Sequence, residues 1–254
     1  MSKTMSSAHK KAQGLLGRAI RDYDMIQDGD RIAVAVSGGK DSFALLYMLQ
    51  ERLKWLPIHY ELTAVHLDMG FPGTQPEKIQ QACLDMGIPF YFERTDYGLK
   101  AHSEDNKENP CFLCAWLRRK HFFKLSQQLH FSKIALGHNK DDIIETLFLN
   151  MFFSGELSTM MPKQALFNNT LTIIRPLAFL EESRVKGLAK HLGLPEIPNP
   201  CPSASKSYRR EIKDFLGSFY ARNRKIRGNI FHALSHVRPD YLPTVGLRDP
   251  KGKG

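Results

Sequence analysis

Short apolar stretches alternate with longer amphipathic stretches along most of this chain. The apolar stretches have the length and content of strands buried on both faces of a sheet, and they span residues 31–36, 60–69, 89–95, 133–137 and 171–176. The amphipathic stretches have helical spacing and span residues 9–26, 41–54, 76–87, 111–130, 141–153 and 181–192. This alternation predicts an α/β fold, a doubly wound parallel sheet with helical additions.

The same pattern predicts how the chain is organised. Residues 1–28 are expected to form an N-terminal helical segment, and 29–200 the α/β domain with the helix that begins near residue 111. Residues 201–254 are expected to add a basic helix and a tail. Periodic apolar residues become sparse from Gly228 onward, so the expected tail begins there.

Composition narrows the class of protein. The 254 residues suffice for a full core, and 42% hydrophobic with 24% charged residues is typical of a folded globular chain. An excess of 36 Lys and Arg over 26 Asp and Glu gives a net charge of +10, which favours a polyanionic partner such as nucleic acid. No stretch reads as a signal peptide or reaches the roughly 18 apolar residues of a membrane span, so a cytoplasmic protein without membrane association is expected.

A glycine-rich turn lies between a buried strand and a helix in AVAVSGGKDSFALLYML, residues 33–49. Backbone N–H groups at such a turn lie at the positive end of the helix dipole and bind phosphate. Gly38 and Gly39 let the backbone approach an anion closely. Lys40 adds a positive charge, and the hydroxyls of Ser37 and Ser42 add short donors. The structural alternative is a tight turn with an incidental lysine.

This turn matches neither of two common phosphate-binding motifs, because GxGxxG and GxxxxGKS are both absent. It resembles the pyrophosphate-binding loop of the PP-loop ATPases, which split ATP into AMP and pyrophosphate. The resemblance implies a fold like that of the adenine nucleotide alpha hydrolases, with Ser37–Ser42 binding ATP and Asp41 helping to hold Mg²⁺. His66, near the end of the second predicted strand, either frames the adenine or packs in the core.

Four cysteines in a cytoplasmic chain favour metal binding or redox chemistry over structural disulfides. Cys111 and Cys114 form a C-x-x-C at the start of a predicted helix, where the helix dipole is expected to lower their pKa values. Alone, this pair fits a redox pair, half of a zinc site or part of an iron–sulfur site. Cys83 is expected to be buried in a helix, whereas Cys201 lies between prolines. The three remaining thiolates suit a [4Fe–4S] cluster with one iron left open.

The order of motifs resembles the tRNA 2-thiocytidine synthetase family from about residue 9 to residue 217. The resemblance begins with KAQGLLGRAIRDYDMIQDGDRIAVAVSGGKDS and continues with PCFLC, after which come Trp116, Arg118 and Arg119. It continues with ALGHNKDDIIETLFLN, with IRPL, and with a late cysteine that arginines follow. The order of these motifs is far more specific than any one of them.

This resemblance implies an ATP-dependent transferase that adenylates the C2 oxygen of an anticodon-loop cytidine, cytidine 32 of tRNA. Sulfur then replaces that oxygen and gives 2-thiocytidine. Cys111, Cys114 and Cys201 would hold the cluster, a cysteine desulfurase would supply sulfur, and a homodimer is expected. Active-site roles are implied for residues around the crevice, namely Lys40, Asp41, Arg118, Gly137, His138, Asp141 and Asp142.

The sequence around Cys201 departs from this family. Pro-Cys-Pro-Ser-Ala, residues 200–204, stands where better-known members have Leu-Cys-Gly-Ser-Gln, and this bears on the identity of the target nucleotide. Related 2-thiouridine enzymes carry zinc-binding cysteine pairs at both ends of the chain. Here no cysteine precedes Cys83 or follows Cys201, which favours the cytidine branch.

Polar and basic segments complete the candidate site. Asp141 and Asp142 either cap a helix or line the crevice at the carboxyl ends of the strands, where one of them would hold Mg²⁺ or orient the cytosine amino group. Basic clusters with interleaved aromatic residues suit a track for RNA phosphates and bases, and they contain Arg118, Arg119, Lys120, Lys206, Tyr208, Arg209, Arg210, Phe219, Tyr220, Arg222, Arg224, Lys225 and Arg227.

Several other functions remain open from the residues alone. A PP-loop enzyme that amidates, ligates or thiolates another nucleotide or a small molecule would share the ATP loop, and its ligase forms would need no cluster. A tRNA lysidine synthetase would share the loop and the RNA but would have no use for three cysteines. A non-enzymatic iron–sulfur or zinc-sensing RNA-binding protein would keep an inactive loop, and ATP–pyrophosphate exchange in the presence of tRNA would exclude it.

Overall fold

The structure is a computed structural model, and it describes residues 5–107, 109–203 and 208–243. The chain divides into two compact units, Met1–Lys213 and Asp214–Gly254, and each is described by itself. The first unit holds a six-stranded sheet with its helices, and the described part of the second contains helices and no strand.

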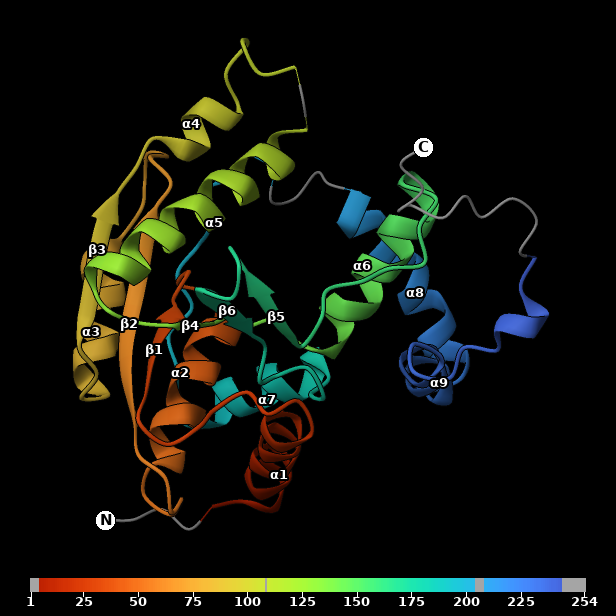
Figure 1. Ribbon diagram of the computed structural model, residues 1–254, viewed down its shortest axis with the longest axis horizontal. Helices are drawn as coiled ribbons and strands as arrows, with labels where there is room; N and C mark the ends of the chain where they lie inside the picture. The colour runs from red at the N-terminus through yellow and green to blue at the C-terminus, as the bar shows by residue number, and fades with distance from the viewer. Residues whose placement is uncertain (1–4, 108, 204–207, 244–254) are drawn as a thin grey trace. The chain divides into compact units, whose positions relative to one another are not determined.

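The sheet forms the centre of the first unit (Figure 1). Its strands are β1 Asp30–Ala35, β2 Tyr60–Asp68, β3 Phe90–Arg94, β4 Lys133–Ala135, β5 Lys163–Leu166 and β6 Leu171–Ile174. They lie in the order β3-β2-β1-β4-β6-β5. β1 pairs in parallel with both β2 and β4, β2 with β3, and β4 with β6, which confirms the predicted α/β fold.

One edge of the sheet differs from the predicted all-parallel arrangement, because β5 runs antiparallel to β6. The two strands form a hairpin that places Lys163 opposite Ile174. Residues 167–169 in its turn adopt positive φ angles, a conformation that asparagine tolerates better than most residues. The sequence of β5, KQAL, lacks a clear apolar pattern, so its apolar periodicity did not reveal this strand.

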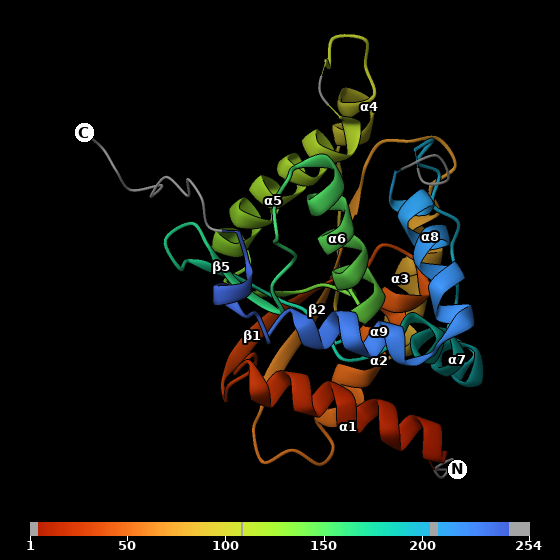
Figure 2. The same cartoon turned by 90° about the vertical axis from the view of Figure 1, so that its right-hand side faces the viewer.

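Helices cover both faces of the sheet, as a doubly wound fold requires (Figures 1 and 2). The helices of the first unit are α1 Ser7–Asp22, α2 Lys40–Arg52, α3 Pro76–Asp85, α4 Tyr97–Ala101, α5 Pro110–Gln128, α6 Lys140–Phe153 and α7 Glu182–Leu192. Residues from α1, α2, α3 and α7 form the larger hydrophobic core with one face, and α5 supplies the helical part of a second core. α4 is an additional short helix that the sequence pattern did not predict.

The predicted N-terminal helix, α1, packs into the core of the first unit. Its cap residue Ser6 accepts a hydrogen bond from the His9 backbone N–H at 3.2 Å. Leu16 and Ala19 on its inner face are fully buried, and the helix contacts α7. The three-part division at residues 28 and 200 stays a prediction.

The C-terminal part of the chain contains more helix than the sequence predicted. α8 Tyr208–Arg222 spans the division between the two units, and α9 Lys225–Ala233 and a 3₁₀ turn follow it. The predicted tail from Gly228 is therefore wrong up to Ala233. α9 has no buried residue, which explains why its sequence lacks the periodic apolar pattern of a core helix. Among the described residues, no helix has both the length and the apolar character needed to cross a membrane.

The strand order determines where a ligand site can form. From β1 the chain passes through α2 to β2 on one side, and from β4 it passes through α6 toward β6 on the other. The loops after β1 and β4 therefore diverge and leave a crevice at the carboxyl ends of these strands, the usual ligand position in open α/β sheets. The glycine-rich turn and the segment 137–142 both lie at this edge.

Candidate functional site

The glycine-rich turn leaves the first turn of α2 available to an anion. The Val36 N–H donates to the Val65 carbonyl at 2.9 Å, so strand geometry persists up to the turn. Gly38 then adopts a φ of +87°, in the left-handed region that favours glycine. Gly39 is the N-cap of α2 and has no side chain to cap it, so the first N–H groups remain without a side-chain acceptor there. The Ser42 hydroxyl donates to the Gly39 carbonyl at 2.8 Å and stabilises the turn.

Gly137 brings the loop after β4 against this turn. A Cβ atom at Gly137 would lie 3.0 Å from both the Asp41 carbonyl carbon and the Ser42 nitrogen. These are backbone atoms at the start of a helix, so they have little freedom to move away. Glycine at this position therefore permits the two loops to meet.

A third segment, residues 194–199 after α7, lies on the glycine-rich turn. The Ile197 N–H donates to the Gly38 carbonyl at 2.9 Å. The Glu196 carboxylate forms an ion pair with the Lys40 ammonium, whose side chain is about one-third exposed. This segment leads directly to Cys201, so the chain links the glycine-rich turn to the third candidate cysteine.

Asp41 lies in an acidic environment at the start of α2. Burial, together with the nearby Asp142 and Glu182 carboxylates, raises the pKa of Asp41 to about 6. The Asn139 side-chain amide donates to the Asp41 carboxylate at 3.1 Å and partly offsets this effect. A cation at this position would relieve the repulsion, so the surroundings of Asp41 suit a divalent ion.

Asp141 and Asp142, the two aspartates after β4, accept hydrogen bonds from different helix starts. The Asp141 carboxylate accepts the Glu182 backbone N–H at 2.7 Å, which satisfies the first turn of α7. The Asp142 carboxylate accepts the Asn139 N–H at 2.9 Å and completes a capping box on α6. The Asp142 carboxylate adds to the effect of burial in raising the pKa of Asp41, and it lies 3.7 Å from the Arg209 guanidinium.

His138 is a neutral residue among cations. Burial lowers its pKa to about 3, and the guanidinium groups of Arg175, Arg209 and Arg118 contribute to this shift. The Arg175 Nε donates to the His138 Nδ1 at 3.3 Å. His138 therefore stays uncharged at neutral pH.

His66 connects the end of β2 to the start of the glycine-rich turn. It is buried, and its Nδ1 lies 2.7 Å from the Val36 carbonyl. Its ring stacks at 5.9 Å on the ring of Phe92. Burial lowers the His66 pKa, and Arg118 contributes to the decrease. His66 thus combines core packing with a position beside the turn, and its role toward adenine stays a prediction.

Two of the three candidate cysteines, Cys111 and Cys114, lie near the start of α5, and Cys201 lies in the segment after α7. Asn109 caps this helix by accepting the Cys111 backbone N–H at 2.9 Å. Burial is the main cause that raises the pKa of Cys114, and both Cys201 and Cys111 raise it further. The predicted lowering by the helix dipole is therefore wrong for Cys114, because burial outweighs the cationic Arg118, which donates a hydrogen bond to the thiol.

Two hydrogen bonds fix the Cys201 segment, one within the segment and one to the residue that follows α4. The Cys201 N–H donates to the Asn199 side-chain oxygen at 3.1 Å. Ser203 and the ring of His102, which follows α4, form a hydrogen bond of 2.8 Å. In the part of the chain that the structure describes, no group of three or more His, Cys, Asp or Glu side chains is arranged to hold a metal ion.

Cys83 differs from the other three cysteines as predicted. It is fully buried inside α3, and burial raises its pKa to about 12. A thiol in this environment stays protonated and packs as a small apolar side chain.

Sequence reasoning missed several residues that shape this site. Asn139 carried a detectable signal, because an Asn followed by Asp at the third position is a capping pattern. Arg175 lies within the IRPL motif but received no role. Glu182 and Glu196 carried no signal, because only their distant partners in the chain reveal them. Lys206 lies outside the described residues.

Comparison with known proteins identifies the family. Residues 8–213 match the PP-loop domain. The chain is 38% identical to the tRNA-cytidine(32) 2-sulfurtransferase of Geobacter sulfurreducens over 94% of its own length and 95% of that protein. It is 39% identical to the protein of the same name from Syntrophotalea carbinolica, with 94% of each chain covered.

The chain belongs to the tRNA-cytidine(32) 2-sulfurtransferase family. Among solved structures, this family member resembles the U34-tRNA thiolase NcsA from Methanococcus maripaludis, determined with its [4Fe-4S] cluster. The TM-score is 0.74 and the identity 26%, with 91% of this chain and 80% of that chain covered. The NH3-dependent NAD synthetase from Campylobacter jejuni shares the fold, with a TM-score of 0.53 at 16% identity over 91% of this chain and 93% of that chain.

Gly38 and Gly187 provide a matched test of the glycine-rich turn. Gly38→Ala places a Cβ 3.1 Å from the Ile197 Cβ at a positive φ, so we expect it to lower the free energy of unfolding by about 1–2 kcal/mol. Gly187→Ala, in α7 with open space around it, should instead add about 0.5–1 kcal/mol. Urea unfolding of both variants checks this, and equal stability would contradict the described turn.

Proposed function

We propose that this protein adenylates the C2 oxygen of cytidine 32 in tRNA and then replaces it with sulfur. The observation that carries the proposal is the contact of residues 194–199 with the glycine-rich turn, just before Cys201. Cys201 in turn influences the thiol of Cys114. These links favour one crevice that serves both ATP and the three thiols, and family membership supplies the class of reaction.

The glycine-rich turn and Lys40 would bind the pyrophosphate part of ATP. The uncapped first turn of α2 offers N–H donors at the positive end of the helix, and the Lys40 ammonium adds charge. Asp41 and Asp142 would hold Mg²⁺ together with phosphate oxygens and water. Mg²⁺ commonly takes only one or two carboxylates from the protein, so a closed cage of protein ligands is not required.

The residues around the crevice suit adenylation of a neutral carbonyl. The C2 oxygen of cytosine attacks the α-phosphorus, the new O–P bond forms and pyrophosphate leaves. A sulfur nucleophile then adds at C2 and AMP departs with the original oxygen. Lys40 and the N–H groups of the turn stabilise the negative charge on the departing pyrophosphate. Burial keeps His138 neutral, and its Nδ1 already accepts from the Arg175 Nε, so its Nε2–H is left to donate a hydrogen bond without adding charge.

The donor set of Cys111, Cys114 and Cys201 fits an iron–sulfur cluster. Thiolate sulfur is the preferred ligand of iron–sulfur clusters, and Cys201 and Cys111 add to the effect of burial in raising the pKa of Cys114. A [4Fe–4S] cluster bound there would keep one iron without a protein ligand, a place for hydrosulfide to bind. Arg118 lowers the pKa of Cys114 against the effect of burial, so it favours the thiolate that ligation requires.

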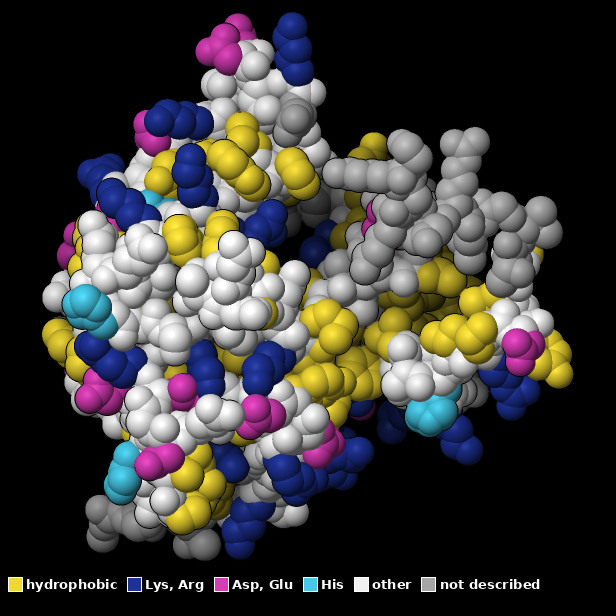
Figure 3. Space-filling view, in the orientation of Figure 1, with side chains coloured by type: hydrophobic (Ala, Val, Ile, Leu, Met, Phe, Trp, Pro, Cys, Tyr) yellow, Lys and Arg dark blue, Asp and Glu magenta, His cyan; other side chains and the backbone are white. Residues whose placement is uncertain are grey.

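Some basic residues of the predicted RNA track are engaged in contacts within the protein, so they are less available to bind phosphate. Arg209 pairs with Glu145 at 3.4 Å and donates to the Thr146 hydroxyl at 3.2 Å, so its guanidinium is engaged within the protein. In the second unit, Arg227 lies over the Tyr220 ring at 4.4 Å from its centroid. By contrast, Lys and Arg side chains gather over α4 and α5 (Figure 3), which makes that surface a candidate for binding tRNA.

Three further expectations stay predictions: a cysteine desulfurase as sulfur donor, a homodimer and a cytoplasmic location.

Lys40→Ala tests the role of the turn. Loss of one well-placed donor to a developing anion typically costs about 10²–10³ in rate, so we expect thiolation of tRNA to fall by at least the lower figure. The visible absorbance of the cluster should be unchanged, because Lys40 contacts no thiol. Lys190→Ala, an exposed lysine in α7, is the control and should keep full activity. Near-normal turnover of Lys40→Ala would remove the turn from the mechanism.

Glu196→Gln tests whether Glu196 competes with ATP for Lys40. An exposed ion pair of this kind contributes about 0.2–1 kcal/mol, so its loss should lower the ATP dissociation constant by up to about fivefold. Isothermal titration calorimetry measures this change, with Glu77→Gln on α3 as the control. Weaker ATP binding would show that Glu196 supports the site instead of competing for its lysine.

The chemical reaction is tested by mass spectrometry of nucleosides. Anaerobically prepared protein should convert cytidine 32 of an unmodified tRNA to 2-thiocytidine when ATP, Mg²⁺ and sulfide are supplied. Cys201→Ser should lose both the product and the cluster chromophore, whereas Cys83→Ala should keep both, because Cys83 is buried away from solvent in α3. Product formation by a colourless Cys201→Ser protein would exclude the cluster from the reaction.

A further inference from the structure

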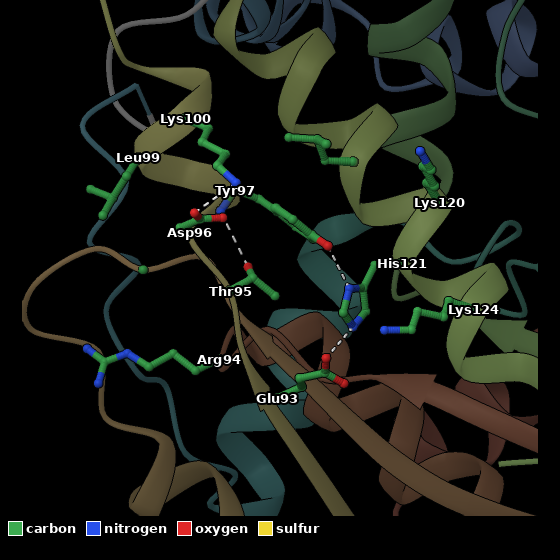
Figure 4. A pocket seen from close by; sticks show the side chains of 12 residues that line it. Glu93, Arg94, Thr95, Asp96, Tyr97, Leu99, Lys100, Lys120, His121 and Lys124 are labelled. Carbon is green, nitrogen blue, oxygen red and sulfur yellow. Dashed lines mark hydrogen bonds and ion pairs between the residues drawn. The ribbon is translucent and has the colours of Figure 1, made fainter. Parts of the chain in front are cut away.

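A second cavity lies outside the crevice described above. It has a volume of about 790 Å³ and opens between the end of β3, α4 and the middle of α5 (Figure 4). Cationic side chains from three segments line it, namely Arg94, Lys100, Lys120 and Lys124. None of the steps of adenylation or sulfur transfer uses this cavity.

One wall of the cavity is held by contacts of the buried His121 side chain with its neighbours. The His121 side chain is only 5% exposed. Its Nδ1 lies 2.8 Å from the Tyr97 hydroxyl, and its Nε2 lies 3.2 Å from a Glu93 carboxylate oxygen (Figure 4). The other Glu93 oxygen accepts from the Tyr91 hydroxyl at 3.2 Å. These contacts join α4, α5 and β3 and engage the Glu93 charge within the wall.

The four cationic side chains of the cavity differ in whether they contact a carboxylate of the protein. Lys100 forms an ion pair with Asp96 at 2.9 Å, and the Arg94 guanidinium lies 3.9 Å from the Asp68 carboxylate. Lys120 and Lys124 have no carboxylate partner within the described ranges. Both are exposed, so the cavity offers two ammonium groups to an anion from solvent.

Aromatic side chains lie next to these lysines on α5. Phe112, Trp116 and Lys120 follow at four-residue spacing, which places them along one side of the helix. Phe112 is 60% exposed and Trp116 is 45% exposed. The Lys120 ammonium lies 5.3 Å from the centroid of the Trp116 ring. Exposed aromatic rings beside unpaired cations are the combination that binds single-stranded nucleic acid, because bases stack while phosphates meet the charges.

The same helix links this surface to the candidate thiols. Cys114 and Lys120 are both on α5, and six residues of helix span about 9 Å along the axis. An RNA loop with one base in the crevice can therefore extend along α5 to the lysines. A free inorganic anion would not use the aromatic residues, which favours RNA as the ligand.

We propose that this cavity binds a backbone phosphate of tRNA through Lys120 and Lys124, with Trp116 stacking on a neighbouring loop base. The inference rests on the proposed function for the identity of the RNA. It adds a defined anchoring site beyond the adenylation crevice. Tyr97, His121 and Glu93 act as positioning residues that hold α5 against β3.

The charge contribution is tested with a double variant, Lys120→Ala with Lys124→Ala, in the full chain with its cluster. Binding of an unmodified tRNA transcript is measured by fluorescence anisotropy across a salt series. Loss of two phosphate contacts should reduce the slope of log affinity against log salt by about 1.4–1.8. The control, Lys10→Ala with Lys11→Ala on α1, removes the same charge from exposed positions and should leave the slope unchanged.

The stacking contribution gives a different readout. Trp116→Ala should weaken tRNA binding about 5- to 150-fold without changing the salt slope, because no charge is removed. Trp116→Phe should restore most of the affinity. Wild-type affinity for Trp116→Ala, or a wild-type slope for the lysine variant, would overturn the proposed site.

The outcomes separate this inference from the proposed reaction. If the salt slope changes as expected but no 2-thiocytidine forms, the reaction is wrong and the RNA site stands. If 2-thiocytidine forms while the lysine variant binds tRNA with the wild-type slope, the RNA site is wrong and the reaction stands. If the lysine variant loses binding of inorganic phosphate while its tRNA slope is unchanged, the cavity binds small anions and the RNA assignment is overturned. Absence of any tRNA binding by the wild-type protein would overturn both.

Discussion

The close approach of Gly137 to the first turn of α2 is the contact on which the rest of the site depends. A side chain at Gly137 would meet the Asp41 and Ser42 backbone at 3.0 Å, so even a methyl group would force the loops after β1 and β4 apart. Their contact brings Asn139 within hydrogen-bond distance of Asp41. It also places Asp142 near enough to raise the Asp41 pKa. The contact that Gly137 permits therefore contributes to the acidic environment of Asp41, together with burial and Glu182.

Acidic and basic side chains occupy different parts of the crevice. Carboxylates gather on the side of α2 and α6, where burial and mutual repulsion raise the pKa of Asp41 to about 6 and that of Glu145 to about 7. Guanidinium groups lie around His138, and burial together with these charges lowers its pKa to about 3. The positive charge of Arg118 helps to lower the pKa values of His66 and His138, and it opposes the rise in the pKa of Cys114. Arg118 therefore acts on residues of both the candidate nucleotide site and the candidate sulfur site. This separation suits a reaction that handles a magnesium-bound polyphosphate and a sulfur nucleophile in neighbouring places.

The segment from α7 to Cys201 contacts the glycine-rich turn and also carries one of the candidate cluster ligands. Its backbone bonds to Gly38, and its Glu196 pairs with Lys40, the lysine that would meet the phosphates of ATP. Only a few residues later, Asn199 accepts the Cys201 N–H. A polyphosphate bound at Lys40 would compete with Glu196 for the Lys40 ammonium.

The local sequence pattern by itself predicts most of the strands and helices and the main motifs of this protein. Buried strands and amphipathic helices have periodicities that can be read within ten to twenty residues, and the glycine-rich turn and the C-x-x-C are contiguous motifs. The hairpin strand β5 and the helix α9 were missed because neither has a sufficiently apolar face. The fold decided that Asn139 reaches Asp41, that Arg209 turns toward Glu145, and that Glu196 reaches Lys40. These relations depend on residues far apart in the chain, and their contact follows from the order of the strands and the packing of the loops, which local spacing does not specify.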